Sequence, residues 1–584
     1  MNVSITICHK DKEELYTLPN GAPIKPLLQE HSLLDFPCGI GKCGKCLIYA
    51  NSEPTAEERK KLDENALSSG LRLACHTKAF EGLKIAIPAK NALCVLSSFT
   101  RKGFEFKPAI RKEAFRISPA SIERPQTDED RVLEATSAKT SALPLAELRK
   151  LPHRLKHFEN SSTEGYALIQ GDTLLGISTE AAHHALIVDI GTTTVAVTLL
   201  NLETQRIAAT KGAHNAQYPY GADVVSRIKS TIEQGTEPLE KAIINQLNTM
   251  LDALRAETGI ADVSVISLAG NTTMMHLLCG IPPEFIGKAP FTPVSMRATQ
   301  LPACELGLNT SAQAFLLPSI SSYIGADIVA SLLAVGAYQA KKPFLLIDFG
   351  TNAETVLFAN NTFYCCSAAA GPCFEGATLS CGMAGQAGAI DTVELSAQNT
   401  VSYTSIENAT PQGLCGSGVL DAIALMLETK ALDETGRIEP EKDCPLRDCV
   451  NSEKGFMLTP KVSLTQADIR EVQLAKAAVR AGIEVLIAEA GLDISDIETL
   501  YLAGGFGSAL KANSAVRIGL IPEQLLEKIC VMGNATSFGA LRYITEENAA
   551  GHVQSIMDRA QYLELSARPE FTNAYIEQMV FPEK

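Results

Sequence analysis

The sequence predicts a multidomain protein of the α+β and α/β classes, in which a small β-rich domain precedes a large two-lobed α/β domain. Two observations carry this prediction. The first is a set of four cysteines with metal-ligand spacing within the first 90 residues, three of them close together and the fourth further along the chain. An internal repeat with an offset of 348 − 189 = 159 residues places the same Asp-x-Gly-Thr pattern after two apolar strands in the later part of the chain.

Changes in composition and in hydrophobic periodicity divide the chain into four regions. Residues 3–20 alternate like a β-hairpin, and residues 83–88 read as the strand that closes the first domain. Residues 116–145 are rich in Ser, Pro, Thr and charge, which favours a linker. A helix and two strands then predict a small middle domain, and apolar strands alternate with helices from there to the end. The predicted boundaries are 1–90, 91–145 (linker), 146–182 (middle domain) and 183–584.

Composition and charge narrow the class of protein. The formal net charge is −15, and no lysine-rich or arginine-rich tract is present, which argues against nucleic acid and anionic membrane as partners. The N-terminus lacks a basic and apolar leader, and the longest apolar stretches, such as 328–337, are too short to span a bilayer. We therefore expect a cytoplasmic protein that keeps its 16 cysteines reduced.

The cysteine pattern is the most specific signal in the chain. Cys38, Cys43 and Cys46 are separated by four and two residues, and Cys75 follows after 28 more. Zinc sites usually use paired Cys-x2-Cys units, and only one such pair is present in this group. A metal cluster is favoured over zinc or structural thiols. The residues between the first three ligands include Gly39, Gly41 and Gly44, which allow a loop to wrap closely around a cluster.

This arrangement resembles the plant-type ferredoxin domain over the first 90 residues, including all four ligands. The resemblance implies a β-grasp fold and a [2Fe–2S] cluster with a potential on the order of −400 mV.

Two glycine- and threonine-rich turns suggest phosphate binding. Residues 189–194 follow a buried strand and offer backbone N–H groups and hydroxyls to phosphate, and residues 348–352 repeat the device. The leading residues, Asp189 and Asp348, can hold Mg²⁺ or its water. A third segment, 502–507, carries paired glycines that would let a base or ribose lie against the backbone.

In this order, the three segments resemble the phosphate-1, phosphate-2 and adenosine motifs of the acetate kinase–sugar kinase–Hsp70–actin (ASKHA) superfamily. The resemblance spans roughly 183–545 and implies a two-lobed ATP-binding domain that closes on its nucleotide. Asp189 and Asp348 are the predicted catalytic residues. The predicted nucleotide-binding residues are Gly191, Thr192, Thr193, Thr194, Gly350, Thr351, Asn352, Gly416, Ser417, Gly504 and Gly505.

A low-potential cluster and an ATP cleft in one chain suggest that ATP helps to move an electron to an acceptor harder to reduce than the cluster. The chain resembles the ATP-dependent reductive activators of corrinoid proteins, which reduce inactive Co(II) to Co(I) in methyltransferase systems. Further stretches that carry this resemblance are 270–274, 370–377, 413–418 and 468–473. The resemblance implies a corrinoid protein and an upstream low-potential electron donor as partners, and it leaves a homodimer open.

Several residues allow two interpretations. Asn271 and Thr272 either face the cleft or cap a helix. Ser417 precedes a helix and either meets phosphate or caps that helix. Gln473 and Lys476 either approach nucleotide or belong to a solvated helix face, and the solvated face is the preferred interpretation.

Two other functions compete with corrinoid activation. One is an ATP-driven electron donor to another enzyme, such as a dehydratase. Activators of that type carry a cluster that bridges two short subunits, unlike the cysteine pattern here. The other is a nucleotide-regulated protein whose cluster only reports redox state. Formation of Co(I) from a Co(II) corrinoid protein would separate the three.

Overall fold

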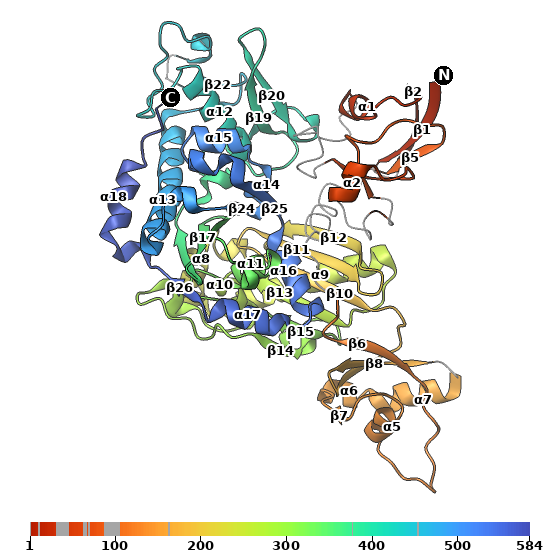
Figure 1. Ribbon diagram of the computed structural model, residues 1–584. Coiled ribbons are helices and arrows are strands. Elements are labelled where there is room, and N and C mark those ends of the chain that lie inside the picture. The colour runs from red at the N-terminus through yellow and green to blue at the C-terminus, as the bar shows by residue number, and fades with distance from the viewer. Residues whose placement is uncertain are drawn as a thin grey trace.

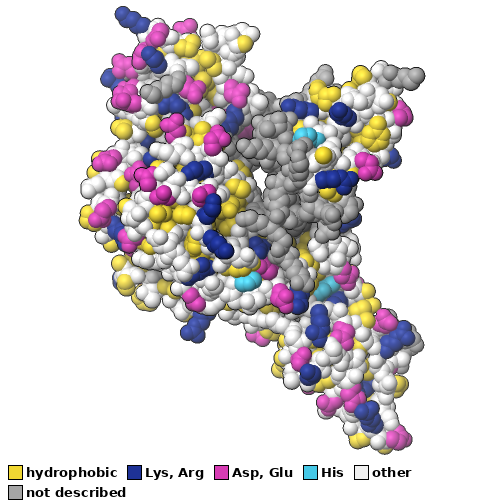
Figure 2. Space-filling view, viewed as in Figure 1, with side chains coloured by type: hydrophobic (Ala, Val, Ile, Leu, Met, Phe, Trp, Pro, Cys, Tyr) yellow, Lys and Arg dark blue, Asp and Glu magenta, His cyan; other side chains and the backbone are white. Residues whose placement is uncertain are grey.

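The fold is taken from a computed structural model, which places three bodies along the chain (Figure 1). It describes residues 2–9, 12–30, 46–61, 67, 71–86, 106–161, 164–376, 378–451 and 455–583. Within these ranges, no helix is both long enough and apolar enough to cross a membrane. On the face seen in Figure 2, Lys and Arg side chains are scattered among Asp and Glu rather than gathered into one basic surface.

The N-terminal domain is a five-stranded mixed sheet in the order β2-β1-β5-β3-β4. The predicted hairpin is confirmed: β1 pairs antiparallel with β2, and β5 runs parallel to β1 on its other side. Val3, Ile5 and Ile7 alternate along β1 and are buried in this domain's core. The bounds are β1 Asn2–His9, β2 Lys12–Pro19, α1 Lys25–Glu30, β3 Leu47–Ala50, α2 Ala56–Lys61, β4 Leu71–Leu73 and β5 Leu83–Ala86.

The small middle domain begins earlier in the chain than the sequence suggested. The predicted helix and two strands are present as α7, β8 and β9, but β6 and β7 extend the same sheet in the order β6-β8-β9-β7. Phe115 of β6 and Val132 of α5 pack into one core with Phe158 and Ile169. Part of the predicted 91–145 linker therefore belongs to this domain. The bounds are β6 Arg111–Phe115, α5 Asp128–Glu134, β7 Thr140–Ser141, α6 Leu145–Leu148, α7 Leu151–Ser161, β8 Gly165–Gln170 and β9 Thr173–Ser178.

The large domain is built from two halves with matching sheets. The first sheet has the order β12-β11-β10-β13-β15-β14 and the second β18-β17-β16-β24-β25, with β26 added beside β18. In each half the first strand pairs antiparallel with the next and parallel with the strand on its other side. The internal repeat found in the sequence is thus a structural repeat.

The strands of the two sheets have these bounds: β10 His184–Ile190, β11 Thr194–Asn201, β12 Arg206–His214, β13 Val265–Gly270, β14 Thr299–Pro302, β15 Gln313–Leu316, β16 Phe344–Phe349, β17 Ala353–Ala359, β18 Thr362–Ala368, β24 Thr499–Ala503, β25 Ile529–Gly533 and β26 Ala560–Tyr562. Short strands outside these sheets are β19 Ala389–Leu395, β20 Val401–Ser405, β21 Gly413–Leu414, β22 Phe456–Met457 and β23 Ser463–Leu464. The central strands read as continuous apolar runs because both of their faces are covered; Leu345, Leu346 and Ile347 are all buried.

The helices of the large domain are α8 Val224–Gln234, α9 Glu237–Thr258, α10 Thr272–Leu278, α11 Ala326–Ala334, α12 Gly416–Glu428, α13 Gln466–Ala490, α14 Gly504–Ala509, α15 Ala512–Arg517, α16 Ala535–Thr545, α17 Ala549–Met557 and α18 Pro569–Glu577.

Helix α16 connects the two halves. It follows β25 of the second sheet, yet its side chains, such as Phe538 and Leu541, join the core of the first half. It packs closely on α11, because a Cβ added at Gly539 would lie 1.7 Å from the carbonyl oxygen of Ala330. Only glycine allows this approach, which brings the start of α16 to the end of β10, where the predicted site lies.

Candidate nucleotide and cluster sites

The two predicted phosphate turns are matching hairpins at the ends of β10 and β16. The Gly191 N–H donates to the Thr194 carbonyl at 2.9 Å, and the Gly350 N–H donates to the Asn352 carbonyl at 2.9 Å. A Cβ at Gly191 would lie 2.7 Å from the Thr194 oxygen, so this turn closes only with glycine. Asp189 and Asp348 stand just before the two turns, in corresponding positions of the repeat.

Asp189 and Asp348 lie in one electrostatic cluster with Asp327. Burial, followed by repulsion from Asp327, raises the pKa of Asp189 to about 7, and burial with repulsion from Asp327 and Asp189 raises the pKa of Asp348 to about 8. Burial also raises the pKa of Asp327 to about 6. Each of these residues keeps part of its surface exposed. The arrangement is a largely buried acidic cluster, called the acidic floor below, that a bound cation would stabilise.

Asp327 and Glu354 are members of this cluster that the sequence analysis missed. Glu354 follows the second turn, and burial with repulsion from Asp327 and Asp348 raises its pKa well above the ordinary value. Among the described residues, no three acidic, His or Cys side chains lie close enough to hold a metal by themselves. A cation here would use water and phosphate oxygens as its remaining ligands, as Mg²⁺ commonly does.

Helix α16 supplies a neutral partner to the acidic floor. The side-chain oxygen of Asn534 accepts a hydrogen bond from the Ser537 N–H at 2.7 Å and thereby caps α16. Its Nδ2 donates to Oδ2 of Asp189 at 3.2 Å, which favours the ionised form of that carboxyl group.

The first turn is held by three residues from neighbouring elements. Asn215 Nδ2 donates to the Gly191 carbonyl at 2.8 Å, and Arg227 of α8 donates to the Thr192 carbonyl at 2.6 Å. Asn271 Nδ2 donates to the Thr192 hydroxyl at 2.9 Å. Asn271 also caps α10, which confirms the capping interpretation for this residue. That the segment faces a nucleotide remains a prediction.

The predicted adenosine segment lies against the second turn. Gly504 has φ +79°, and a Cβ there would lie 2.6 Å from Oδ1 of Asp348. Gly505 has no atom within 4 Å of its would-be Cβ, so the backbone there is open to a ligand. The segment thus approaches Asp348 through Gly504, and its assignment to adenosine remains a prediction.

Gly416 and Ser417 lie beside this segment, but their local contacts are structural. A Cβ at Gly416 would lie 1.9 Å from the Phe374 carbonyl oxygen, and the Ser417 hydroxyl donates to the Asp391 carbonyl at 2.9 Å. Phe374 stacks on Phe506 of α14 with ring centroids 5.0 Å apart. Their assignment to nucleotide remains a prediction.

Gln473 and Lys476 do not form a solvated helix face. Both are buried, with exposed fractions of 3% and 0%. Gln473 donates to the Met579 carbonyl at 2.8 Å, and Lys476 donates to the Val580 carbonyl. The preferred interpretation was wrong because the C-terminal segment covers this face of α13.

Two of the four predicted cluster ligands lie in the described part of the chain. Cys46 and Cys75 place their sulfurs 3.2 Å apart, and the Ala74 N–H donates to the Cys46 carbonyl at 2.8 Å, joining the two segments. This donor set fits two thiolates on one iron. Cys38 and Cys43, and the glycines between the ligands, lie outside the described residues.

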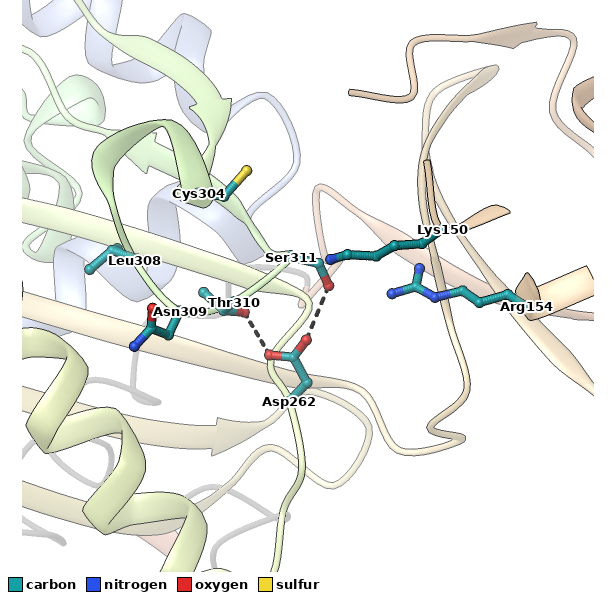
Figure 3. Close-up of a pocket in the computed structure, with 8 residues that line it drawn as sticks. All are labelled: Lys150, Arg154, Asp262, Cys304, Leu308, Asn309, Thr310 and Ser311. Atoms are coloured by element: carbon teal, nitrogen blue, oxygen red, sulfur yellow. Dashed lines mark hydrogen bonds between the residues drawn. The ribbon is translucent and has the colours of Figure 1, made fainter. Parts of the chain in front are cut away.

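A separate cavity of about 340 Å³ lies between the middle domain and the first half of the large domain (Figure 3). Lys150 and Arg154 face it from one side and Asp262 from the other. The Asp262 carboxylate accepts from the hydroxyls of Thr310 at 2.6 Å and Ser311 at 3.0 Å. None of the predicted site residues lines this cavity. We interpret it as a gap in the interface between the two domains.

Both halves of the large domain match models of a known protein family. The family model described as the RACo middle region matches residues 184–340, and the model described as the C-terminal domain of RACo, the ASKHA domain, matches residues 342–584. The division falls between the two structural halves. The predicted ASKHA domain, 183–584, spans both halves, whereas the family models give that name to the second half.

Whole-chain relatives agree with the family models. The corrinoid activation enzyme RamQ of Eubacterium limosum is 28% identical over 576 residues, which cover 93% of each chain. The Co(II) methylated amine-specific corrinoid protein reductase of Methanosarcina barkeri is 24% identical over 427 residues, covering 67% of this chain and 76% of that one. The solved structure of a reductive activator for corrinoid, iron-sulfur protein has a TM-score of 0.73 and 27% identity, covering 99% of this chain and 98% of that chain. With both family models matching in order along one chain, this protein belongs to the RACo family of reductive activators of corrinoid proteins.

Proposed function

We propose that this protein uses ATP to pass one electron from a [2Fe–2S] cluster to the Co(II) form of a corrinoid protein, which yields Co(I) for methyl transfer. The observation that carries the proposal is the presence, in one chain, of two cysteines whose sulfurs lie 3.2 Å apart and of two matching Gly-Thr turns whose leading aspartates belong to one acidic cluster. The names of the relatives identify the class of acceptor.

Cys38, Cys43, Cys46 and Cys75 would hold the cluster, which supplies reversible one-electron transfer at low potential when bound. The short distance between the Cys46 and Cys75 sulfurs supports this ligand set. In the transfer, one electron leaves the reduced cluster and Co(II) gains it. An external low-potential donor must then return one electron to the cluster.

The cleft residues would bind ATP with Mg²⁺. The turns at 189–194 and 348–352 offer N–H groups and hydroxyls to phosphate, and the open backbone at Gly505 lies where a nucleoside could rest. Asp189 and Asp348 would hold the cation or its water, and the negative charge of Asp327, which raises the pKa of both, would further favour a cation there.

ATP is needed because Co(I) is expected to lie at a lower potential than the cluster. For a one-electron step, a tenfold change in equilibrium corresponds to about 59 mV. A gap of one or two hundred millivolts is therefore on the order of a few kcal/mol, which a difference in binding between two partner states can supply.

The test is the yield of Co(I) from a purified Co(II) corrinoid protein mixed with this protein, reductant and Mg·ATP. Cys46→Ser should remove the plant-type EPR signal and the Co(I) band but leave ATP turnover. Asp348→Asn should remove ATP turnover and Co(I) but leave the EPR signal. Cys304→Ser and Asp172→Asn, at an exposed thiol and an exposed carboxylate away from both sites, are the matched controls.

Full Co(I) formation in either site variant, or a zinc content in place of iron, would contradict the proposal. Normal cluster reduction with no effect of ATP on Co(I) would instead favour a redox sensor.

A further inference from the structure

We propose that Asn271 is a positioning residue that turns the hydroxyl proton of Thr192 toward the phosphates of ATP. The inference rests on the proposed function, because it concerns the first phosphate turn of that site. It assigns to residues 270–274 a role in nucleotide binding beyond the capping of α10.

The orientation of the Asn271 amide is fixed by its own helix. Its Oδ1 accepts a hydrogen bond from the Met274 N–H at 3.0 Å. Since a backbone N–H can only donate, the amide oxygen must occupy this position and the NH₂ group must point the other way. That group meets the Thr192 hydroxyl at 2.9 Å, so Asn271 acts there as the donor.

A hydroxyl group that accepts from Asn271 must direct its own proton elsewhere. A hydroxyl carries one proton and two acceptor positions, and Asn271 offers no acceptor on this side. Phosphate oxygens only accept, so a Thr192 hydroxyl held as a donor is suited to them. Thr192 keeps part of its surface exposed, as a ligand contact requires.

Contacts with neighbouring elements fix the backbone of the first turn, so that movement of the backbone does not carry the Thr192 hydroxyl away from Asn271. Arg227 is fully buried and donates to the carbonyls of Thr192 at 2.6 Å and Gly221 at 2.9 Å. The end of β13 also packs closely against β10, since a Cβ at Gly270 would lie 2.5 Å from the Ile190 carbonyl oxygen. Asn271 and the turn are thus presented to each other by rigid strand ends.

The experiment separates the cap from the contact with Thr192. Asn271→Ser keeps a good capping oxygen but is too short to reach Thr192, whereas Asn271→Ala loses both functions. We expect Asn271→Ser to keep the melting temperature near wild type and to weaken binding of Mg·AMPPNP, measured by calorimetry, about tenfold. Asn271→Ala should lose both. Thr127→Ala removes the cap of α5 in the middle domain, and it should lower stability without changing the affinity for nucleotide.

A double-mutant cycle with Thr192→Val gives the decisive comparison. Thr192→Val should itself weaken binding about tenfold, and Asn271→Ser should add nothing in that background. Wild-type affinity in Asn271→Ser, or independent effects of the two changes, would overturn the inference. Wild-type affinity in Thr192→Val would instead remove Thr192 from the proposed nucleotide site.

Asn271→Asp provides a second variant should the serine variant fold poorly. Aspartate caps as well as asparagine but would accept the Thr192 proton and place a negative charge near phosphate. Binding should weaken by more than tenfold. Unchanged affinity in this variant would also overturn the inference.

Discussion

Four carboxyl groups with raised pKa values, those of Asp189, Asp327, Asp348 and Glu354, determine how the ligand-free protein responds to pH. Asp189 and Asp348 were predicted from the repeat, because each precedes a Gly-Thr turn that recurs in the chain. Asp327 carries no such local signal: it stands near the start of α11 in an apolar helical stretch. Its place between the turns arises only when the two halves come together, so a single sequence could not reveal it.

The raised pKa of Asp348 predicts a specific pH dependence of stability. Its pKa is raised from 3.8 to about 8, so between these values the unfolded chain releases a proton that the folded chain keeps. The stability from this group is therefore present below about pH 4 and is lost as the pH rises through about 8. The side chain in Asp348→Asn cannot ionise. The melting temperature of this variant should therefore rise relative to that of wild type as the pH increases from 5 to about 8.5 in metal-free buffer.

Differential scanning calorimetry across this pH range, in the presence of a chelator, measures the effect. Asp172→Asn, at an exposed carboxylate paired with Lys139, should show no such trend. Addition of Mg·ATP should stabilise wild type but not Asp348→Asn, since the cation replaces the proton. Parallel melting curves for wild type and Asp348→Asn would show that the carboxyl group is not strained in the empty cleft.

At the scale of elements, helix α16 runs from Asp189 at the first turn to the segment that leads into the middle domain. Its first residue follows Asn534, which contacts Asp189, and its 11 residues span about 16 Å. At its other end, the carbonyls of Ile544 and Thr545 accept hydrogen bonds from the Ala109 and Lys107 N–H groups at 2.7 and 2.6 Å. The last carbonyls of a helix lack partners within it, and here the segment leading into β6 supplies them.

This contact also explains why the linker prediction was partly wrong. The linker prediction rested on the Ser, Pro, Thr and charged residues of 116–145, which are signals of a loop. The residues just before β6, 106–110, read Phe-Lys-Pro-Ala-Ile and show no periodic pattern. Their structure depends on the end of a helix more than 400 residues later in the chain, as the pairing of Phe106 with Glu546 shows. Local sequence patterns contain no information about such a partner. The long strands and helices of the large domain, by contrast, were predicted correctly because their apolar periodicity is a local property.

Ala109→Pro tests the role of this contact, because it removes one donor to the end of α16. Loss of that hydrogen bond should cost about 1 kcal/mol of local stability. Hydrogen exchange should become faster at residues 106–111, and protection of this segment by Mg·ATP, expected in wild type, should weaken.

Pro108→Ala is the matched control, since residue 108 donates no hydrogen bond in this segment and the change restores an ordinary backbone. If hydrogen exchange in this segment of the wild-type protein is the same with and without Mg·ATP, a coupling through α16 is contradicted.

At the scale of the whole molecule, the chain combines a cysteine-bearing sheet domain, a middle domain and two halves of one repeated fold (Figure 1). The repeat was visible in the sequence, and the matching strand orders confirm it. The cysteine spacing predicted a shared site, and the close approach of Cys46 and Cys75 agrees with it. The positions of the domains relative to one another could not be predicted, because they depend on contacts between segments that are distant in sequence.

The most direct test of the central claim is a stopped-flow measurement of electron transfer under anaerobic conditions. Chemically reduced protein is mixed with a Co(II) corrinoid protein, with or without Mg·ATP, and the absorbance of the cluster and of Co(I) is followed together. The account predicts that, with Mg·ATP, cluster oxidation and Co(I) formation proceed in parallel and in equal amounts, and that without it little Co(I) forms. Equal rates and yields of Co(I) in the absence of nucleotide would contradict it.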